Sequence, residues 1–260
     1  MTAVSKINWP GWLAFAALWL AWEMVSRALP GLALYVPSMG QILASLGQLL
    51  LSGTLLTHLG VSLLRFFEGY VIAAALAVTL GVVLGYFRSL HDLLGMAIEF
   101  LRPMPSVAII PVAILALGLG DSMIVAVTVY ACLWPILINT IDGVRHVDAT
   151  TVDTGRTFGL SARQILWRII LPAASPYIVT GLRIGLSIAL ILVTTAEMVA
   201  GSRGLGFFIL DEERSMNSGH MYAGVLLVAL LGYGLNRGFL LLERKAMGWH
   251  HGMTGRGAQA

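Results

Sequence analysis

The chain has 260 residues, of which 58% are hydrophobic and only 11% are charged, and its formal net charge is +3. Roughly a quarter of the residues in a soluble domain are charged, so this composition excludes an ordinary soluble protein and indicates one embedded in a membrane. The excess of basic residues does not indicate nucleic-acid binding, because these residues lie between the apolar segments and form no single patch. The one cysteine, Cys132, excludes an intramolecular disulfide and is expected to be a small buried residue.

Six apolar segments are each close to the ~20 residues that cross a bilayer. We therefore expect an all-α membrane protein with about six transmembrane helices, forming a single domain over residues 1–260. The first segment is long enough to span and no clear cleavage site follows it, so we interpret it as a membrane anchor. The more polar stretch that follows it is expected to lie along the membrane surface. The expected spans are residues 12–29, 67–87, 93–117, 122–141, 174–199 and 221–242.

Arginines and prolines inside the spans are candidates for a transport pathway. A charge inside a span is unfavourable by several kcal/mol on insertion scales, about 2.5–3.5, and usually faces a cavity or a partner. Proline removes a helix hydrogen bond and opens the backbone locally. If Arg102 faces a pathway, its charge would balance an anionic substrate; the alternative is an internal ion pair with Glu99 or Glu68. The candidates are Arg102, Pro103, Pro105 and, closer to a helix end, Arg183.

The distribution of Lys and Arg predicts the orientation of the spans. With the amino terminus in the cytoplasm, four arginines fall on the outer side, namely Arg27, Arg65, Arg203 and Arg214. Ten basic residues then fall on the cytoplasmic side: Lys6, Arg88, Arg145, Arg156, Arg163, Arg168, Arg237, Arg244, Lys245 and Arg256. We therefore expect both termini and the segment 145–172 to be cytoplasmic.

Segment 145–172 is the longest polar interruption in the second half of the chain, and it predicts two short helices. Asp148 is placed to cap the first helix, which ends where Gly159 permits a left-handed residue. Ser161, with a glutamine three residues later, forms a capping box that begins the second helix at residue 162. That helix is expected to stop before Pro172. The first helix is rich in threonine, so we expect it to depend on a partner surface.

The same segment resembles the cytoplasmic loop of ABC importer permeases. That loop follows the pattern Glu-Ala-Ala, three residues, Gly, nine residues, Ile, one residue, Leu-Pro. Here Asp153-Thr154-Gly155 takes the place of the triplet, and the later positions match at the same spacing. The resemblance implies a coupling helix that fits a groove of a separate ATPase subunit. The coupling residues it implies are Asp153, Gly155, Gly159, Leu160, Ser161, Ile169, Leu171 and Pro172.

Other stretches resemble the nitrate, sulfonate and taurine branch of these permeases. They include EFLRPMPSVAIIPVAILALGLG at 99–120 and AEMVAGSRGLGFFI at 196–209. The resemblance implies the methionine-importer-type permease fold, with a core of about 57–242, one added amino-terminal helix and a short cytoplasmic tail at 243–260. It also implies a bacterial inner-membrane location, a second copy of the chain, two ATPase subunits that bind ATP and Mg²⁺, and an extracytoplasmic binding protein. The implied substrate is a small anion, sulfonate or taurine first, and nitrate or bicarbonate second.

Glu197 lies near the outer end of the fifth span, where the resemblance places an acidic residue close to the outer gate. A carboxylate is a poor contact for an anion, so it is expected to hold the gate or to bind a cationic amino group such as that of taurine. An ion pair with Arg203 at the helix end is the alternative. Gly204 and Gly206 follow as further gate candidates.

No motif in the chain indicates catalysis. There is no Gly-x-x-x-x-Gly-Lys-Ser/Thr phosphate loop and no hydrolase or zinc-protease pattern. His250 and His251 are adjacent but lack further ligands. We expect no enzyme activity, no catalytic residues, no metal and no cofactor in this chain. The alternative function is a secondary transporter driven by an ion gradient, for which Glu23 and Glu99 are the plausible acidic residues.

Overall fold

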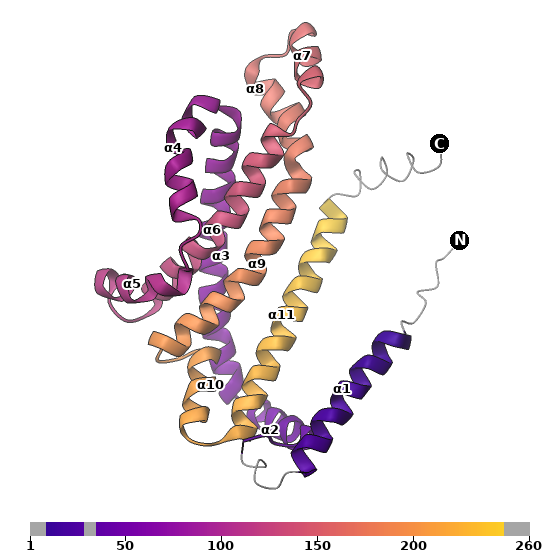
Figure 1. The fold of residues 1–260 in the computed structure, drawn as a ribbon, viewed down its shortest axis with the longest axis vertical. Coiled ribbons are helices and arrows are strands. Elements are labelled where there is room, and N and C mark those ends of the chain that lie inside the picture. Colours follow the sequence, from indigo (N-terminus) through magenta and orange to yellow (C-terminus); the bar gives the residue numbers. More distant parts are fainter. Residues whose placement is uncertain (1–8, 29–34, 247–260) are drawn as a thin grey trace.

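The computed structural model describes residues 9–28 and 35–246, and within them every regular element is helical (Figure 1). Predictions that involve Lys6, Leu29, His250, His251, Arg256 or the tail from 247 onward lie outside the described residues. The elements are α1 (Trp9–Ala28), α2 (Met39–Leu51), α3 (Thr54–Tyr86), α4 (Arg88–Leu101), η2 (Ser106–Ile109), α5 (Ile110–Leu117), α6 (Asp121–Arg145), α7 (Ala149–Thr157), α8 (Ala162–Ile165), η3 (Leu166–Ile170), α9 (Leu171–Ala200), α10 (Leu205–Arg214) and α11 (Ser218–Ala246).

Helices α3, α6 and α9 form the centre of the bundle, with α7 and α8 at one end and α10 at the other (Figure 1). Small residues let these helices approach closely. A Cβ added at Gly81 of α3 would lie 2.6 Å from Cβ of Thr140 in α6, and one added at Gly181 of α9 would lie 2.9 Å from Cβ of Asn139. Close backbone approach of this kind replaces the hydrophobic driving force that helices lack in lipid.

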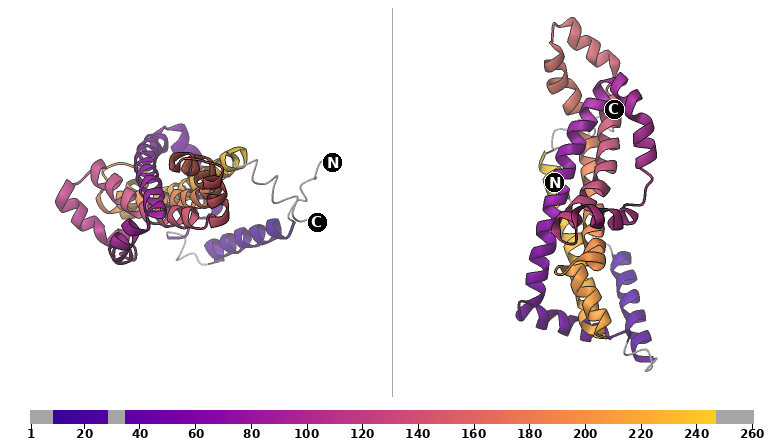
Figure 2. Two further views of the ribbon diagram at one scale, coloured as in Figure 1. Left: turned by 90° about the horizontal axis from the view of Figure 1, so that it is seen from above. Right: turned by 90° about the vertical axis from the view of Figure 1, so that its left-hand side faces the viewer.

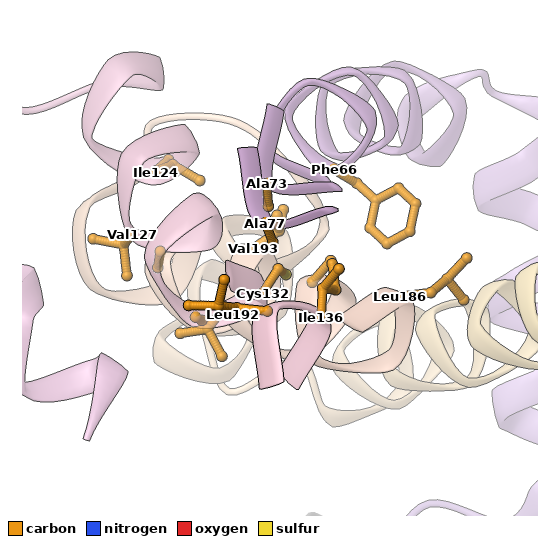
Figure 3. Close-up of a cluster of buried hydrophobic side chains, with 14 of the residues drawn as sticks. Phe66, Ala73, Ala77, Ile124, Val127, Cys132, Ile136, Leu186, Leu192 and Val193 are labelled. Carbon is orange, nitrogen blue, oxygen red and sulfur yellow. The ribbon is translucent and has the colours of Figure 1, made fainter. Parts of the chain in front are cut away.

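Apolar side chains from the three central helices make one buried cluster (Figure 3). Cys132 is fully buried in it, and its thiol lies 3.3 Å from the carbonyl oxygen of Gly185, so the prediction of a small buried cysteine is confirmed. The labelled members are Phe66, Ala73, Ala77, Ile124, Val127, Cys132, Ile136, Leu186, Leu192 and Val193. These contacts hold α3, α6 and α9 together between the two ends of the molecule.

Four described segments are long and apolar enough to cross a membrane: α3, α6, the continuous helix from Ala162 to Ala200, and α11. The expected start of the second span at residue 67 is wrong, because α3 already begins at Thr54. Ser62, which is 3% exposed, and Arg65, which is 4% exposed, lie in the first half of α3, in a stretch that was expected to lie along the membrane surface. They lie inside α3 because they bond to other helices of the bundle.

The third expected span, 93–117, is interrupted at its two prolines, as the sequence predicts. Helix α4 ends at Leu101, and the segment η2–α5 that follows turns away from it by 87° (Figures 1 and 2). Pro103 and Pro105 carry no N–H, so the chain between the two helices cannot continue the helical hydrogen bonding. The pair counts as a fifth crossing only if the two bent parts are taken as one span.

Helix α1 matches the expected amino-terminal helix in position, but it is not among the described helices that are both long and apolar enough to cross a membrane. Its tryptophans and its Glu23–Arg27 pair lower its hydropathy. The Glu23 carboxylate lies 2.6 Å from Arg27 and accepts a hydrogen bond from the backbone N–H of Met39 at 3.0 Å. Glu23 therefore joins α1 to the start of α2, a structural use that competes with the ion-coupling role considered above.

The second helix expected in segment 145–172 does not stop before Pro172, so that prediction is wrong. A turn of π-helix, η3, carries the chain from α8 into α9, and the N–H of Leu171 bonds to the carbonyl of Leu166. Pro172 follows this π turn directly, and its missing N–H leaves one hydrogen bond of the continuing helix unmade. The result is one helix of 39 residues from Ala162 to Ala200.

Candidate functional site

Residues 148–165, here called the α7–α8 knob, project from one end of the bundle (Figure 1). Both predicted caps are confirmed. The Asp148 carboxylate accepts a hydrogen bond from the N–H of Thr150 at 3.2 Å. Ser161 and Gln164 form the reciprocal capping box, at 3.4 and 2.8 Å. The backbone N–H of Thr150 is the main cause that lowers the pKa of Asp148, because it stabilises the ionised carboxylate.

The turn between the two helices is a Schellman motif centred on Gly159. Gly159 has φ +75°, and its N–H bonds to the carbonyl of Arg156 at 2.9 Å. The next N–H, of Leu160, bonds to the carbonyl of Gly155 at 3.1 Å. These two bonds satisfy the carbonyls at the end of α7 and fix the angle between α7 and α8.

The inner face of the knob packs onto the helix that leads into α9. A Cβ added at Gly155 would lie 2.6 Å from Cδ1 of Ile169, 3.5 Å from Leu160 and 3.7 Å from Ile165. A glycine at position 155 therefore lets α7 pack closely against the apolar cluster beneath it. This packing stabilises α7, whose intrinsic helix propensity is poor. Asp153 lies on the opposite, exposed face and pairs with Arg156 at 3.0 Å.

Two large apolar side chains at the knob and just after it are exposed and were not among the predicted coupling residues. Phe158 is 81% exposed and Trp167 is 64% exposed. Large apolar side chains in a segment that is otherwise polar are the signal that identifies them, because a protein surface rarely leaves such groups uncovered without a partner. The knob therefore presents an apolar contact surface as well as a charged one.

An ion cluster with a buried centre and one exposed member, Asp121, lies near the opposite end of α9. It joins Ser62 and Arg65 of α3, Asp121 of α6 and Glu197 of α9, and we call it the Glu197 cluster. Glu197 is 0% exposed. The hydroxyl of Ser62 lies 2.9 and 2.8 Å from its two carboxylate oxygens, and Nη1 of Arg65 donates to it at 2.8 Å. Nε of Arg65 donates to Asp121 at 2.8 Å, so one guanidinium links three helices.

The segment after α9 closes over this cluster, and two of its glycines have no room for a side chain. Gly204 has φ +110°, and a Cβ on it would lie 2.2 Å from Cδ of Glu197. A Cβ on Gly206 would lie 2.1 Å from the carbonyl oxygen of Thr194. The N–H of Gly206 donates to the Glu197 carboxylate at 3.0 Å. The structure thus brings together three predicted gate residues: Glu197, Gly204 and Gly206.

The expected alternative partner of Glu197 is wrong. Arg65 forms the ion pair, and Arg203 contributes only its carbonyl oxygen, which accepts a 2.8 Å hydrogen bond from Arg65. Ser62, Arg65 and Asp121 were missed by sequence reasoning. Ser62 and Arg65 could have been found from the sequence, because the spacing of His58, Ser62 and Arg65 places three polar residues on one face of an apolar helix.

Arg102 and Arg183 lie apart from each other and from the Glu197 cluster. Arg102 is exposed at the end of α4 and, among the described residues, pairs with neither Glu99 nor Glu68. It lines a pocket of about 390 Å³ against α6 and α9. Arg183 lines a different cleft, of about 650 Å³, between α9 and α11, and its Nε lies 3.4 Å from Oδ1 of Asn236.

Comparison with known proteins gives one family and several relatives. Residues 77–247 match the model of the "binding-protein-dependent transport system inner membrane component" family. A putative ABC transporter permease of Methanocaldococcus jannaschii is 35% identical over 76% of this chain and 74% of its own. The taurine transport permease of Escherichia coli is 30% identical over 77% and 73% of the two chains. The nitrate import permease of Synechocystis is 34% identical over 70% and 66%.

A solved structure has the same fold. The methionine ABC transporter MetNI, in an inward-facing conformation, superposes with a TM-score of 0.64 at 18% sequence identity. The match covers 74% of this chain and 95% of that chain. The prediction of a methionine-importer-type permease fold is therefore confirmed, and the uncovered part of this chain leaves room for the added amino-terminal helix.

Proposed function

The chain belongs to the family of binding-protein-dependent transport system inner membrane components, and we propose that it is the transmembrane permease subunit of an ATP-driven importer of small anions. It is a multi-pass membrane protein whose relatives are transport permeases. ATP hydrolysis then takes place in a separate ATPase subunit, which binds ATP and Mg²⁺. The permease contributes the pathway and the moving parts.

The observation that carries this proposal is the α7–α8 knob. Its turn is fixed by Gly159, its inner face is packed through Gly155, and Phe158 on the knob and Trp167 just after it are exposed. A rigid projection with an uncovered apolar surface suits docking into a groove of a partner. The knob also has a direct mechanical link, since the helix that begins in it continues unbroken to Ala200 beside the Glu197 cluster.

We propose that ATP-driven closure of two ATPase subunits displaces the knobs of two permease copies. Because helix 162–200 is continuous, a displacement at the knob becomes a tilt of α9 at the gate. The Glu197 cluster then holds the gate in the closed arrangement. Since the Glu197 carboxylate is already bonded to Ser62, Arg65 and Gly206, it holds helices together and is not free to bind a cationic amino group of a substrate.

The orientation follows from the basic residues. Arg65 is buried in the bundle and so no longer counts among the basic residues of the outer side, where Arg27, Arg203 and Arg214 remain. This stronger excess of basic residues on the other side supports a cytoplasmic location of the knob. The α10 end then faces the extracytoplasmic binding protein. The order of proposed substrates stays sulfonate or taurine first and nitrate or bicarbonate second, supported by what the relatives are named for transporting.

Reconstituted transport tests the proposal. The permease, its ATPase and its binding protein are placed in proteoliposomes, and uptake of labelled taurine, methanesulfonate, nitrate and bicarbonate is measured with ATP supplied on the ATPase side. We expect uptake of at least one anion that requires ATP and persists when ion gradients are collapsed. Uptake driven by an ion gradient without ATP, or uptake of none of the four anions, would overturn the proposal.

A further inference from the structure

The pocket beside Arg102 has the composition of a binding site. It measures about 390 Å³ and is lined by Arg102, Ser106, Ala131, Trp134, Pro135, Ile138, Asn139 and Ile188. This volume falls within the range of about 300–1,000 Å³ that is usual for small-ligand pockets. Its lining is divided about equally between polar and apolar surface, and its residues come from three different parts of the chain: the break after α4, helix α6 and helix α9.

The depth of the pocket makes its charge unusual. Residues 131–139 lie in the middle of α6 (Asp121–Arg145), and Ile188 lies in the middle of α9 (Leu171–Ala200). The pocket is thus well separated along the bundle from both the knob and the Glu197 cluster. A cation at this depth is unfavourable by about 2.5–3.5 kcal/mol on insertion scales unless water, a partner or a ligand compensates it. A lipid headgroup would sit at the membrane surface and not at this level.

No acidic side chain compensates Arg102 within the described part of the protein. Among residues 9–28 and 35–246, no carboxylate forms an ion pair with it. The contrast with Arg65 is direct, because Arg65 is buried and bonded to both Asp121 and Glu197. The guanidinium of Arg102 offers five N–H donors, which match the geometry of a sulfonate, nitrate or carboxylate group.

The other polar groups of the pocket are also mainly donors. Nε1 of Trp134 is shielded from water and has no hydrogen-bond acceptor among the described residues. An unpaired buried donor destabilises a protein by about 1–3 kcal/mol, and an acceptor supplied by a ligand would remove this cost. Ser106 adds a hydroxyl, and Asn139 uses one amide N–H on the carbonyl of Pro135, at 2.7 Å, and keeps a second.

We propose that this pocket is an oxyanion-binding subsite of the permease itself, in which Arg102 holds the charged group of the substrate halfway through the membrane. The inference rests on the proposed import function and adds to it a substrate site within the pathway. The polar contacts of Ser106, Trp134 and Asn139 orient the bound group, and the walls formed by Ile138 and Ile188 limit its size. Selectivity is then shared between the binding protein and the permease.

The test uses the complete complex of permease, ATPase and binding protein. Uptake of labelled taurine, methanesulfonate, nitrate and bicarbonate is compared for the wild type, Arg102→Gln, Arg102→Lys and the control Arg88→Gln. Arg88 is an exposed arginine at the other end of the same helix, α4. We expect Arg102→Gln to lower uptake at least tenfold, Arg102→Lys to retain part of the uptake, and Arg88→Gln to match the wild type.

A binding measurement separates the site from the import function. The permease–ATPase complex without binding protein should bind the transported anion saturably, and Arg102→Gln should abolish this binding. The subsite is overturned if the wild type takes up the anion and Arg102→Gln shows the same uptake and the same binding. The proposed import function would then still stand. No ATP-dependent uptake in the wild type overturns the import function itself. If Arg102→Gln fails to assemble, Ser106→Ala decides: a several-fold higher KM for uptake supports the subsite, and an unchanged KM overturns it.

Discussion

Arg65 and Glu197 lie 132 positions apart in the sequence, yet Nη1 of Arg65 lies 2.8 Å from Oε1 of Glu197, at a site where the carboxylate is 0% exposed. This pair joins α3 to α9 at the end of the bundle that α10 covers. Two buried charges are tolerated there because each is bonded on several sides, through Ser62, Asp121 and the N–H of Gly206. Any motion of α9 that opens this end has to separate the pair.

Removing one member of the pair should destabilise the protein strongly. Arg65→Met leaves buried Glu197 without its cation, and Glu197→Leu leaves Arg65 with Asp121 alone, so we expect each to lose about 3–5 kcal/mol in the free energy of unfolding. The double variant Arg65→Met/Glu197→Leu should recover much of that loss, because no buried charge remains. Thermal unfolding of the purified protein measures all four forms. Additive losses in the double variant would show that the two side chains do not act as a pair.

Gly204 should tolerate no side chain. In Gly204→Ala the new Cβ meets Cδ of Glu197 at 2.2 Å, and the backbone has φ +110°. The backbone conformation alone disfavours alanine by about 1–3 kcal/mol. The matched control is Gly234→Ala in α11, where a Cβ meets nothing within 4 Å. The melting temperature should fall for Gly204→Ala and stay within a degree or two for the control. Equal melting temperatures would mean that the closure over Glu197 is not formed.

A side chain at position 159 should be unfavourable because of the backbone conformation there and not because of steric contact with neighbouring atoms. It has φ +75°, and a Cβ added to it would meet nothing within 4 Å. Gly159→Val should therefore fold but strain the turn by at least ~1–2 kcal/mol, which shifts the knob to other conformations by roughly tenfold. Uptake and ATPase coupling should fall while membrane insertion is unchanged. Gly159→Asn, which adopts this conformation more readily, should retain more uptake than the valine variant.

The cap at Asp148 should make the knob sensitive to acid. Its pKa is lowered in the folded protein, chiefly by the N–H of Thr150. A depressed pKa contributes stability that is present above the unfolded pKa, ~3.9, and is lost as the pH falls through the folded value. Amide protection in α7, corrected for intrinsic exchange rates, should decrease over this acidic range. Asp148→Asn keeps a capping oxygen without the charge, so its protection should be independent of pH there. The same acid dependence in both proteins would contradict the assignment.

Local features were predictable from the sequence, and contacts between distant segments were not. The caps at Asp148 and Ser161 and the turn at Gly159 depend on residues within a few positions of each other. Arg65 was assigned to the outer side because it precedes the expected start of the second span, and its partner Glu197 lies in another helix, 132 positions away. The spacing of polar residues along one face of α3 was the available signal.

The interrupted and continuous helices show the same limit. Pro103 and Pro105 predicted an interruption of the third span, but the 87° bend depends on how the following helix packs. Pro172 predicted the end of a helix, and the π turn before it allows the helix to continue. Proline restricts only its own neighbourhood, so tertiary packing decides whether a helix ends, bends or passes through.

Site-specific cross-linking tests most directly the central claim that the α7–α8 knob docks on an ATPase. In a Cys132→Ser background, which removes the only native thiol, a cysteine is placed at Phe158, which is 81% exposed on the knob, or at Leu51, which is 91% exposed at the end of α2. After addition of a short thiol-reactive cross-linker, Phe158→Cys should form an adduct with the ATPase whose yield changes with ATP, and Leu51→Cys should form none. Absence of an ATPase adduct from Phe158→Cys, or equal adducts from both positions, would contradict the account.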